Sequence, residues 1–449
     1  MLGNEIEDLK QLQAIRRKIR NEAGRRYFFR SLYHCGSKVV VDENKRAAVA
    51  VLANNKTARF YGVTHCKSPW CCPVCTSRQM AKYAADIAVA IDALKEQDQQ
   101  AAMITFTVPH TSGFTCEQTT EILYNVWKAF TVHGNKILAA SKNDIFSNFM
   151  AATESKHRVR VCEYTWGNAG WHPHFHTLFW FPKKHFNEIV QWEEQLENRW
   201  LELCKRYTIR QLLIGYPETQ RKTVKAKVTK RVEIMYKNLD DGCHGLYISK
   251  KNNLPIVQES SNYICGWGAN RELTGNVSYK ASHDGHFTWQ QILQNAIDED
   301  KLAEDSRKNE VSVDAVQVQA EAENKWWTLF FEYAEATKKY RHARINFSVH
   351  SGLKKIIADY KKSNAYKTFS KKNNEKLQKE FGKWRVVCWF TKSQWLSICE
   401  KELQVDILKF AVNGGLTEIN RLLEAYDIPP AVQNIEAAAV LENIYNCAA

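Results

Sequence analysis

The segment 157–181 constrains the fold of this chain more than any other part of the sequence. Two runs rich in β-branched and aromatic residues, "HRVRVCEYTW" and "GWHPHFHTLFWF", flank the turn-forming residues "GNAG". This pattern predicts a β-hairpin. If the hairpin is symmetric about the middle of the turn, Glu163 lies opposite His174, and Cys162 lies opposite Phe175. We therefore expect two antiparallel strands in that register.

Three histidines alternate along the second strand, at positions His172, His174 and His176. Side chains on a strand alternate between its two faces, so these imidazoles share one face with Glu163. Burying imidazoles without partners costs free energy, so this pattern predicts a bound ligand. We predict a metal site formed by His174, His176 and Glu163, with His172 either sharing that face or capping the strand. The alternative is a polar sheet face with unrelated histidines.

The type of metal is left open by these residues. Imidazole favours zinc or other transition metals, whereas the carboxylate also admits magnesium or manganese.

The charge of the chain points to an anionic partner. Its net charge is +14, and nucleic acid is the commonest partner of so basic a protein, although a solvated basic surface is the alternative. The apolar runs are far shorter than the roughly 20 residues that span a bilayer. No apolar signal core opens the sequence, so we expect a cytoplasmic protein.

A cysteine cluster predicts a structural zinc site. Cys66, Cys72 and Cys75 form the pattern C-x5-C-P-x-C, in which the tight turn directs two thiolates at one centre. Zinc needs a fourth ligand, for which Cys35 is preferred, while His65 and Cys71 are alternatives. Such a closed site would brace the N-terminal part of the chain. The competing interpretation is a group of buried free thiols.

A basic stretch at 221–234 is a candidate DNA contact. Valine and alanine alternate there with lysine, which predicts a strand with one lysine-rich face that could follow phosphates. The candidate residues are Lys225, Lys227, Lys230 and Arg231. An edge strand protected by lysines is the alternative.

Several motifs occur in an order typical of one superfamily. "HPHFH" resembles the histidine–hydrophobe–histidine motif of HUH endonucleases. More closely, the chain resembles the rolling-circle plasmid replication initiators that use a single catalytic tyrosine. The further motifs are "CKSPWCCPVCTSRQ", "MITFTVPH", "VCEYTWGNAGWHPHFHTL", "NYICGWGANRELTGN" and "EYAEATKKYRHARINFSVHSGLKK". The resemblance covers about residues 60–360. It implies an α+β fold with an HUH-type antiparallel sheet and flanking helices.

The resemblance also implies a chemistry. A metal-dependent endonuclease and strand transferase would nick one strand at a plasmid origin, and Tyr263 would retain the 5′ phosphate as a phosphotyrosine. Glu259 would activate the terminating transfer. A packed aromatic is the alternative for Tyr263. The family usually has lysine three residues after this tyrosine, but this chain has Gly266, which puts the phosphate contact in doubt; Lys280 is one possible substitute.

The predicted organisation has four parts. Residues 1–30 form a basic helix, 31–300 contain the zinc knuckle and the endonuclease domain, 301–322 form an acidic linker, and 323–449 form a helical C-terminal domain. The last part would bind the origin, self-associate or recruit a host helicase. The expected partner is origin DNA, single-stranded at the nick. The rival functions are an HUH transposase or relaxase, and a non-enzymatic, zinc-braced DNA-binding repressor.

Overall fold

The computed structural model divides into two compact units, each made of segments distant in sequence. One unit comprises residues 1–68, 72–79 and 364–449, and the other comprises 69–71 and 80–363. The structure describes residues 5–20, 29–40, 48–110, 112–131, 145–237, 245–251, 253–256, 286–308, 313–340, 345–347, 352–364, 366–368, 370–371, 375 and 384–432, with the side chains of 306–324, 345 and 347 excepted.

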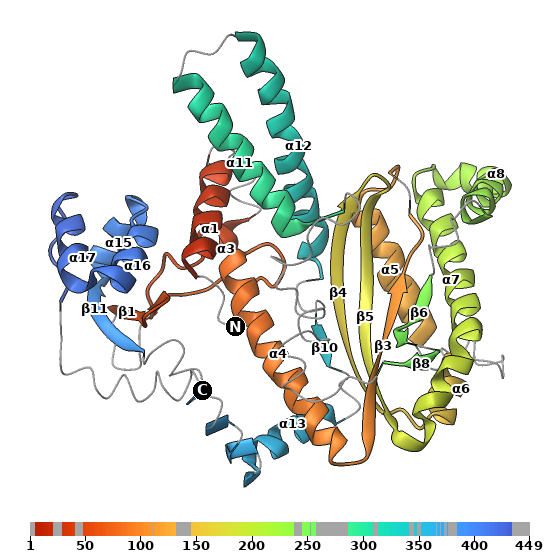
Figure 1. The fold of residues 1–449 in the computed structure, drawn as a ribbon. Helices are drawn as coiled ribbons and strands as arrows, with labels where there is room; N and C mark the ends of the chain where they lie inside the picture. Colours follow the sequence, from red (N-terminus) through yellow and green to blue (C-terminus); the bar gives the residue numbers. More distant parts are fainter. Residues whose placement is uncertain are drawn as a thin grey trace. The chain divides into compact units, whose positions relative to one another are not determined.

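A six-stranded antiparallel sheet forms the centre of the larger unit (Figure 1). Its strand order is β10–β4–β5–β3–β6, and β9 pairs with β4 beside β10. The strands are β3 (Gln99–Thr107), β4 (His157–Gly167), β5 (Gly170–Pro182), β6 (Leu246–Ile248), β9 (Phe287–Thr288) and β10 (Ile345–Phe347). A separate two-stranded ribbon joins β7 (Lys250–Lys251) and β8 (Leu254–Pro255).

The predicted hairpin is confirmed with its register. β4 and β5 pair so that Glu163 faces His174 and Cys162 faces Phe175. The alternation of side chains therefore places the histidines and Glu163 on one face, and Phe175 with its aromatic neighbours on the other. The α+β fold class is likewise confirmed, because antiparallel sheets and helices both occur.

Helices cover the face of the sheet that carries Phe175. Trp127 and Tyr124 of α5 (Cys116–Thr131) contact Phe175 edge-on, with ring centroids 5.3 and 5.1 Å away. Tyr333 of α12 (Val313–Lys338) packs on Tyr164 of β4. The other helices of this unit are α6 (Ile145–Ala152), the 3-10 helix η1 (Lys183–Trp192), α7 (Glu193–Ile214), α8 (Glu218–Lys237), α11 (Trp289–Lys308) and α13 (Leu353–Lys362).

The predicted strand at 221–234 is wrong, because this stretch lies within helix α8. The valines Val228 and Val232 are its buried residues, and their spacing of four is that of one helix face. The alternation of valine, alanine and lysine is thus not a strand pattern here. Lysine, arginine, alanine and glutamate all favour a helix over a strand.

The smaller unit joins both ends of the chain in one sheet. Its strand order is β11–β1–β2, in which β1 (Ala48–Ala53) pairs antiparallel with β2 (Ala58–Tyr61) and with β11 (Arg385–Thr391). Its helices are α1 (Glu5–Arg20), α3 (Arg30–Tyr33), α15 (Lys392–Glu400), α16 (Gln404–Asn413) and α17 (Gly415–Glu424), while α4 (Pro73–Lys95) begins here and continues in the larger unit.

Hydrogen bonds and an aromatic contact join the N-terminal and C-terminal segments of the smaller unit. Gln13 of α1 donates to the backbone oxygen of Glu402 over 2.9 Å and to the Gln404 amide oxygen over 3.0 Å. Phe60 of β2 packs against Trp395 of α15 with ring centroids 4.6 Å apart. The C-terminal segment is thus part of the core around the N-terminal strands.

The acidic residues predicted as a linker lie largely in helices. Residues 301–308 end α11, and residues 313–322 belong to α12. The predicted functional division into four ranges remains a prediction. None of the described helices has the length and apolar character that a membrane span needs.

Candidate metal centres

Glu163, His174 and His176 come together on the predicted sheet face. The two imidazole Nε2 atoms are 3.1 Å apart, and Glu163 Oε2 lies 3.5 Å from each of them. Three atoms at these separations can all lie about 2.1 Å from one divalent ion. The residues could therefore hold a metal ion and leave its remaining coordination positions open.

Neighbouring groups orient both imidazoles for this role. His174 Nδ1 lies 3.3 Å from the backbone oxygen of His172, and His176 Nδ1 lies 2.9 Å from Oγ1 of Thr105. Thr105 faces His176 across the β3–β5 pairing. When Nε2 binds a metal, the ring proton resides on Nδ1 and is donated to these oxygens. Sequence reasoning missed Thr105, because only the pairing of β3 with β5 brings it to the site.

A buried arginine packs against the opposite face of β5, the strand that carries His174 and His176. Arg160 is 7% exposed, and its guanidinium lies 4.2 Å from the ring centroid of Phe175, the residue between His174 and His176 in the sequence. Trp127 and Tyr124 also contact this guanidinium, at 4.9 and 5.2 Å. Burial lowers the pKa of Arg160 below its ordinary value. These contacts limit movement of the strand that carries the imidazoles.

A second pair of histidines adjoins the metal group. His172 lies on the same face but outside the three-residue group, and His110 stacks on it with ring centroids 4.7 Å apart. Burial lowers the pKa of both imidazoles, which are therefore neutral at pH 7. His110 lies at the end of the "MITFTVPH" motif, although its place beside His172 could not be read from that motif.

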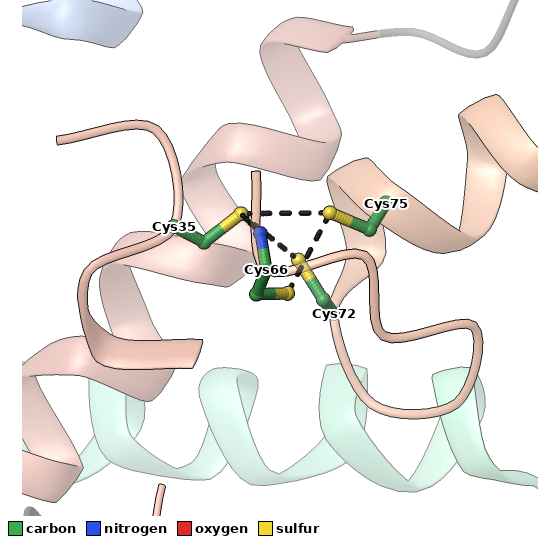
Figure 2. Close-up of side chains that lie close together, drawn as sticks. All are labelled: Cys35, Cys66, Cys72 and Cys75. Carbon is green, nitrogen blue, oxygen red and sulfur yellow. Dashed lines mark hydrogen bonds between the residues drawn. The ribbon is translucent and has the colours of Figure 1, made fainter. Parts of the chain in front are cut away.

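The second candidate metal centre is the cysteine cluster (Figure 2). Cys35, Cys66, Cys72 and Cys75 are all buried, and their sulfur atoms lie within 4.8 Å of one another. The Sγ atom of Cys35 is 3.5 Å from that of Cys75 and 3.6 Å from that of Cys72. Tetrahedral zinc with bonds of about 2.3 Å requires sulfur atoms about 3.8 Å apart. The arrangement therefore fits a single closed zinc site.

The structure brings the preferred fourth cysteine, Cys35, to the cluster. The backbone N–H of Cys66 donates to Cys35 Sγ over 3.4 Å, and that of Ser68 donates to Cys66 Sγ over 3.4 Å. Hydrogen bonds from the neighbouring thiols hold the pKa of Cys35 far below its ordinary value. Of the two alternative ligands, Cys71 is buried but lies outside the four-cysteine group. His65 lies beside the group, with its Nδ1 atom 3.9 Å from Cys35 Sγ.

Positive groups surround the cysteines and suit a negatively charged tetrathiolate site. Arg16 donates to the backbone oxygen of Cys35. Arg78 contacts His65 Nε2 and also bonds the carboxylate of Glu5 over 2.8 and 2.9 Å. The cluster is thereby connected to helix α1 and to the start of α4. Its lack of an open position favours a structural role over a catalytic one.

The candidate DNA contacts lie on α8, at some remove in sequence from both metal groups. Lys225, Lys227, Lys230 and Arg231 are all exposed there. The predicted nucleophile Tyr263 and the predicted second catalyst Glu259 fall outside the described residues, as do Gly266 and Lys280.

Comparison with known protein families gives a match. Nothing similar is found among curated proteins or among solved structures. A sequence model of the Rep_1 family of replication proteins matches residues 57–341, a span that includes Glu163, His174 and His176 and three of the four clustered cysteines. Because the match covers more than half of the 449 residues, the chain belongs to the Rep_1 family of replication proteins.

Proposed function

We propose that this replication protein is a metal-dependent endonuclease and strand transferase that nicks one DNA strand at a plasmid origin. Membership of the Rep_1 family supports the coarser role of plasmid replication initiator. The observation that carries the finer proposal is the convergence of Glu163, His174 and His176, whose ligand atoms lie 3.1 to 3.5 Å apart.

The Glu163–His174–His176 group would hold the divalent ion, which when bound supplies Lewis-acid polarisation of the scissile phosphate. Two imidazoles and one carboxylate suit a transition metal such as Mn²⁺, and the carboxylate also admits Mg²⁺. Thr105 would fix the ring of His176. The neutral His110–His172 pair would line the same face without adding charge.

Tyr263 is the proposed nucleophile. Its phenolic oxygen would bond to the phosphorus and lose its proton, while the bond from phosphorus to the 3′ oxygen breaks and that oxygen becomes a hydroxyl. The 5′ phosphate would stay on Tyr263, and the free 3′ end would prime synthesis. Glu259 is the proposed activator of the later transfer that releases the displaced strand. The basic residues of α8 would contact phosphates, and the four-cysteine cluster would hold structural zinc.

The test uses a single strand spanning the origin nick site, labelled at its 3′ end, with Mn²⁺ present. We expect the wild-type protein to form a covalent adduct that Tyr263→Phe does not form, with DNA binding retained. His174→Ala and His176→Ala should lose the adduct and the metal dependence, whereas His185→Gln, which removes a histidine paired with Glu154 and Glu188, should keep both.

Two results would overturn the proposal. One is nicking by Tyr263→Phe at the wild-type rate. The other is tight origin binding by the wild-type protein with no adduct in either Mn²⁺ or Mg²⁺. That second result would favour the repressor alternative, to which Gly266 in place of the usual lysine also points.

A further inference from the structure

Helix α8 concentrates unpaired positive charge. Its 20 residues include seven lysines and arginines but only two glutamates. The side chains of six of the cations are exposed and form no ion pair or hydrogen bond with any residue that the structure describes. These six are Lys222, Lys225, Lys227, Lys230, Arg231 and Lys237. Arg221 differs, because its guanidinium bonds the backbone oxygen of Tyr216 over 3.1 Å.

Among the residues that the structure describes, the contacts of α8 lie along one side of the helix. Val228 and Val232 are its buried residues, and the Tyr236 hydroxyl bonds Thr208 of α7 over 3.2 Å. In Figure 1, α8 lies next to α7 at the periphery of the sheet. Most of the circumference of α8 therefore faces solvent, which leaves it free to contact a partner.

The six cations without a described partner occupy both flanks and the crest of this exposed surface. A helix turns by about 100° per residue. Measured from the buried valines, Lys222 and Lys225 fall on one flank, and Lys227 and Arg231 fall on the opposite flank. Lys230 and Lys237 lie at the crest between them, and the two glutamates, Glu218 and Glu233, lie on the flank of Lys222 and Lys225. A helix that contacted only one DNA backbone would need cations on only one of its sides. Cations on both flanks fit two phosphate backbones, one on each side of the helix.

The crest itself carries small and apolar groups. Thr219, Thr223 and Ala226 lie there beside Lys230, and all four are exposed. Ile234, which is 50% exposed, lies farther along the same surface. Short side chains let a helix approach base edges closely, and methyl groups of alanine and threonine can contact thymine methyls.

We propose that α8 enters the major groove of double-stranded DNA, with its two flanks bonded to the two backbones. The major groove is about 12 Å wide and admits one helix. This inference rests on the proposed function, which identifies the bound DNA as the duplex that flanks the nick site. It assigns recognition of the duplex to α8 and separates that recognition from the metal centre that would handle the single strand.

Paired flank variants test the geometry. Lys222→Gln/Lys225→Gln and Lys227→Gln/Arg231→Gln each remove two cations from one side. The matched control is Lys354→Gln/Lys355→Gln, which removes two exposed cations of α13 that also form no ion pair with described residues. Affinity for duplex origin DNA and for the corresponding single strand is measured by fluorescence anisotropy across a salt series.

Both flank variants should lose duplex affinity to a similar extent. Each phosphate contact contributes about 0.9 to the slope of log K against log salt, so each double variant should flatten the slope by about two and weaken duplex binding by about 50-fold or more at 0.1 M salt. The control should bind as the wild type does. Ala226→Glu, which adds an acidic residue at the exposed crest, should also weaken duplex binding while the circular dichroism spectrum stays unchanged.

Adduct formation on a single-stranded substrate separates this inference from the proposed nicking. At saturating protein concentration, where weaker phosphate contacts no longer limit binding, the flank variants should still form the adduct on that substrate. Loss of duplex binding in only one flank variant would overturn the groove geometry, as would loss of single-strand binding with duplex binding intact. If no variant, including the wild type, forms an adduct but the flank variants still lose duplex binding, the nicking proposal fails and the role of α8 stands.

Discussion

Replacing Thr105 by valine should weaken metal binding at the Glu163–His174–His176 group. Thr105 is 1% exposed, and its Oγ1 lies 2.9 Å from His176 Nδ1. Valine has nearly the same shape, so the change removes the oxygen without opening a cavity. The His176 N–H would then be buried without an acceptor and the ring would be free to turn.

The loss of such a supporting hydrogen bond typically costs 10- to 100-fold in metal affinity. We therefore expect the dissociation constant for Mn²⁺ to rise by about that factor, or about 1.4–2.7 kcal/mol. Thr105→Ser keeps the hydroxyl and should restore most of the affinity. Isothermal titration calorimetry with zinc already loaded in the cysteine cluster measures this directly.

The matched control is Thr177→Val on the opposite face of the sheet. Thr177 is fully buried and adjoins His176 in sequence, and its side-chain oxygen has no hydrogen-bond partner in the described part of the chain. This substitution should leave Mn²⁺ affinity unchanged and slightly stabilise the protein. Equal affinities for Thr105→Val and the wild type would refute the assignment of Thr105 as an orienting group, and with it the view that His176 binds through Nε2.

Three other expectations concern the smaller unit. Cys35→Ser should lower the bound zinc, whereas Cys71→Ser should not, as metal analysis after gel filtration would show; equal zinc in both would contradict the four-cysteine assignment. Deleting residues 364–449 should leave the N-terminal strands without β11 and yield an unstable chain; a well-folded 1–363 would disprove this dependence. Burial raises the pKa of Asp8 from 3.8 to about 7, so the folded state holds this proton more tightly and its stability should fall as pH rises from about 4 to about 7. Asp8→Asn should lack this fall, raising the melting temperature at pH 8 relative to the wild type, and no difference at that pH would count against a buried carboxylate.

Local spacing was enough to predict which residues form the candidate metal site. The register of β4 with β5 depends on strand alternation and a short turn, both of which are visible in neighbouring residues. Glu163, His174 and His176 could therefore be named together. Alternation misled at α8, because valine and lysine at every second position occur by chance in a helix whose buried residues repeat every fourth position.

The sequence by itself determined the hairpin, the three candidate metal ligands on one face and three of the four clustered cysteines, because each of these is set by residues a few positions apart. Only the tertiary structure decided that Cys35 completes the cluster, that Thr105 orients His176 and that β11 pairs with β1. Those contacts join segments separated by tens to hundreds of residues. Their partners are selected by the packing of the whole chain, which no local pattern of side chains encodes.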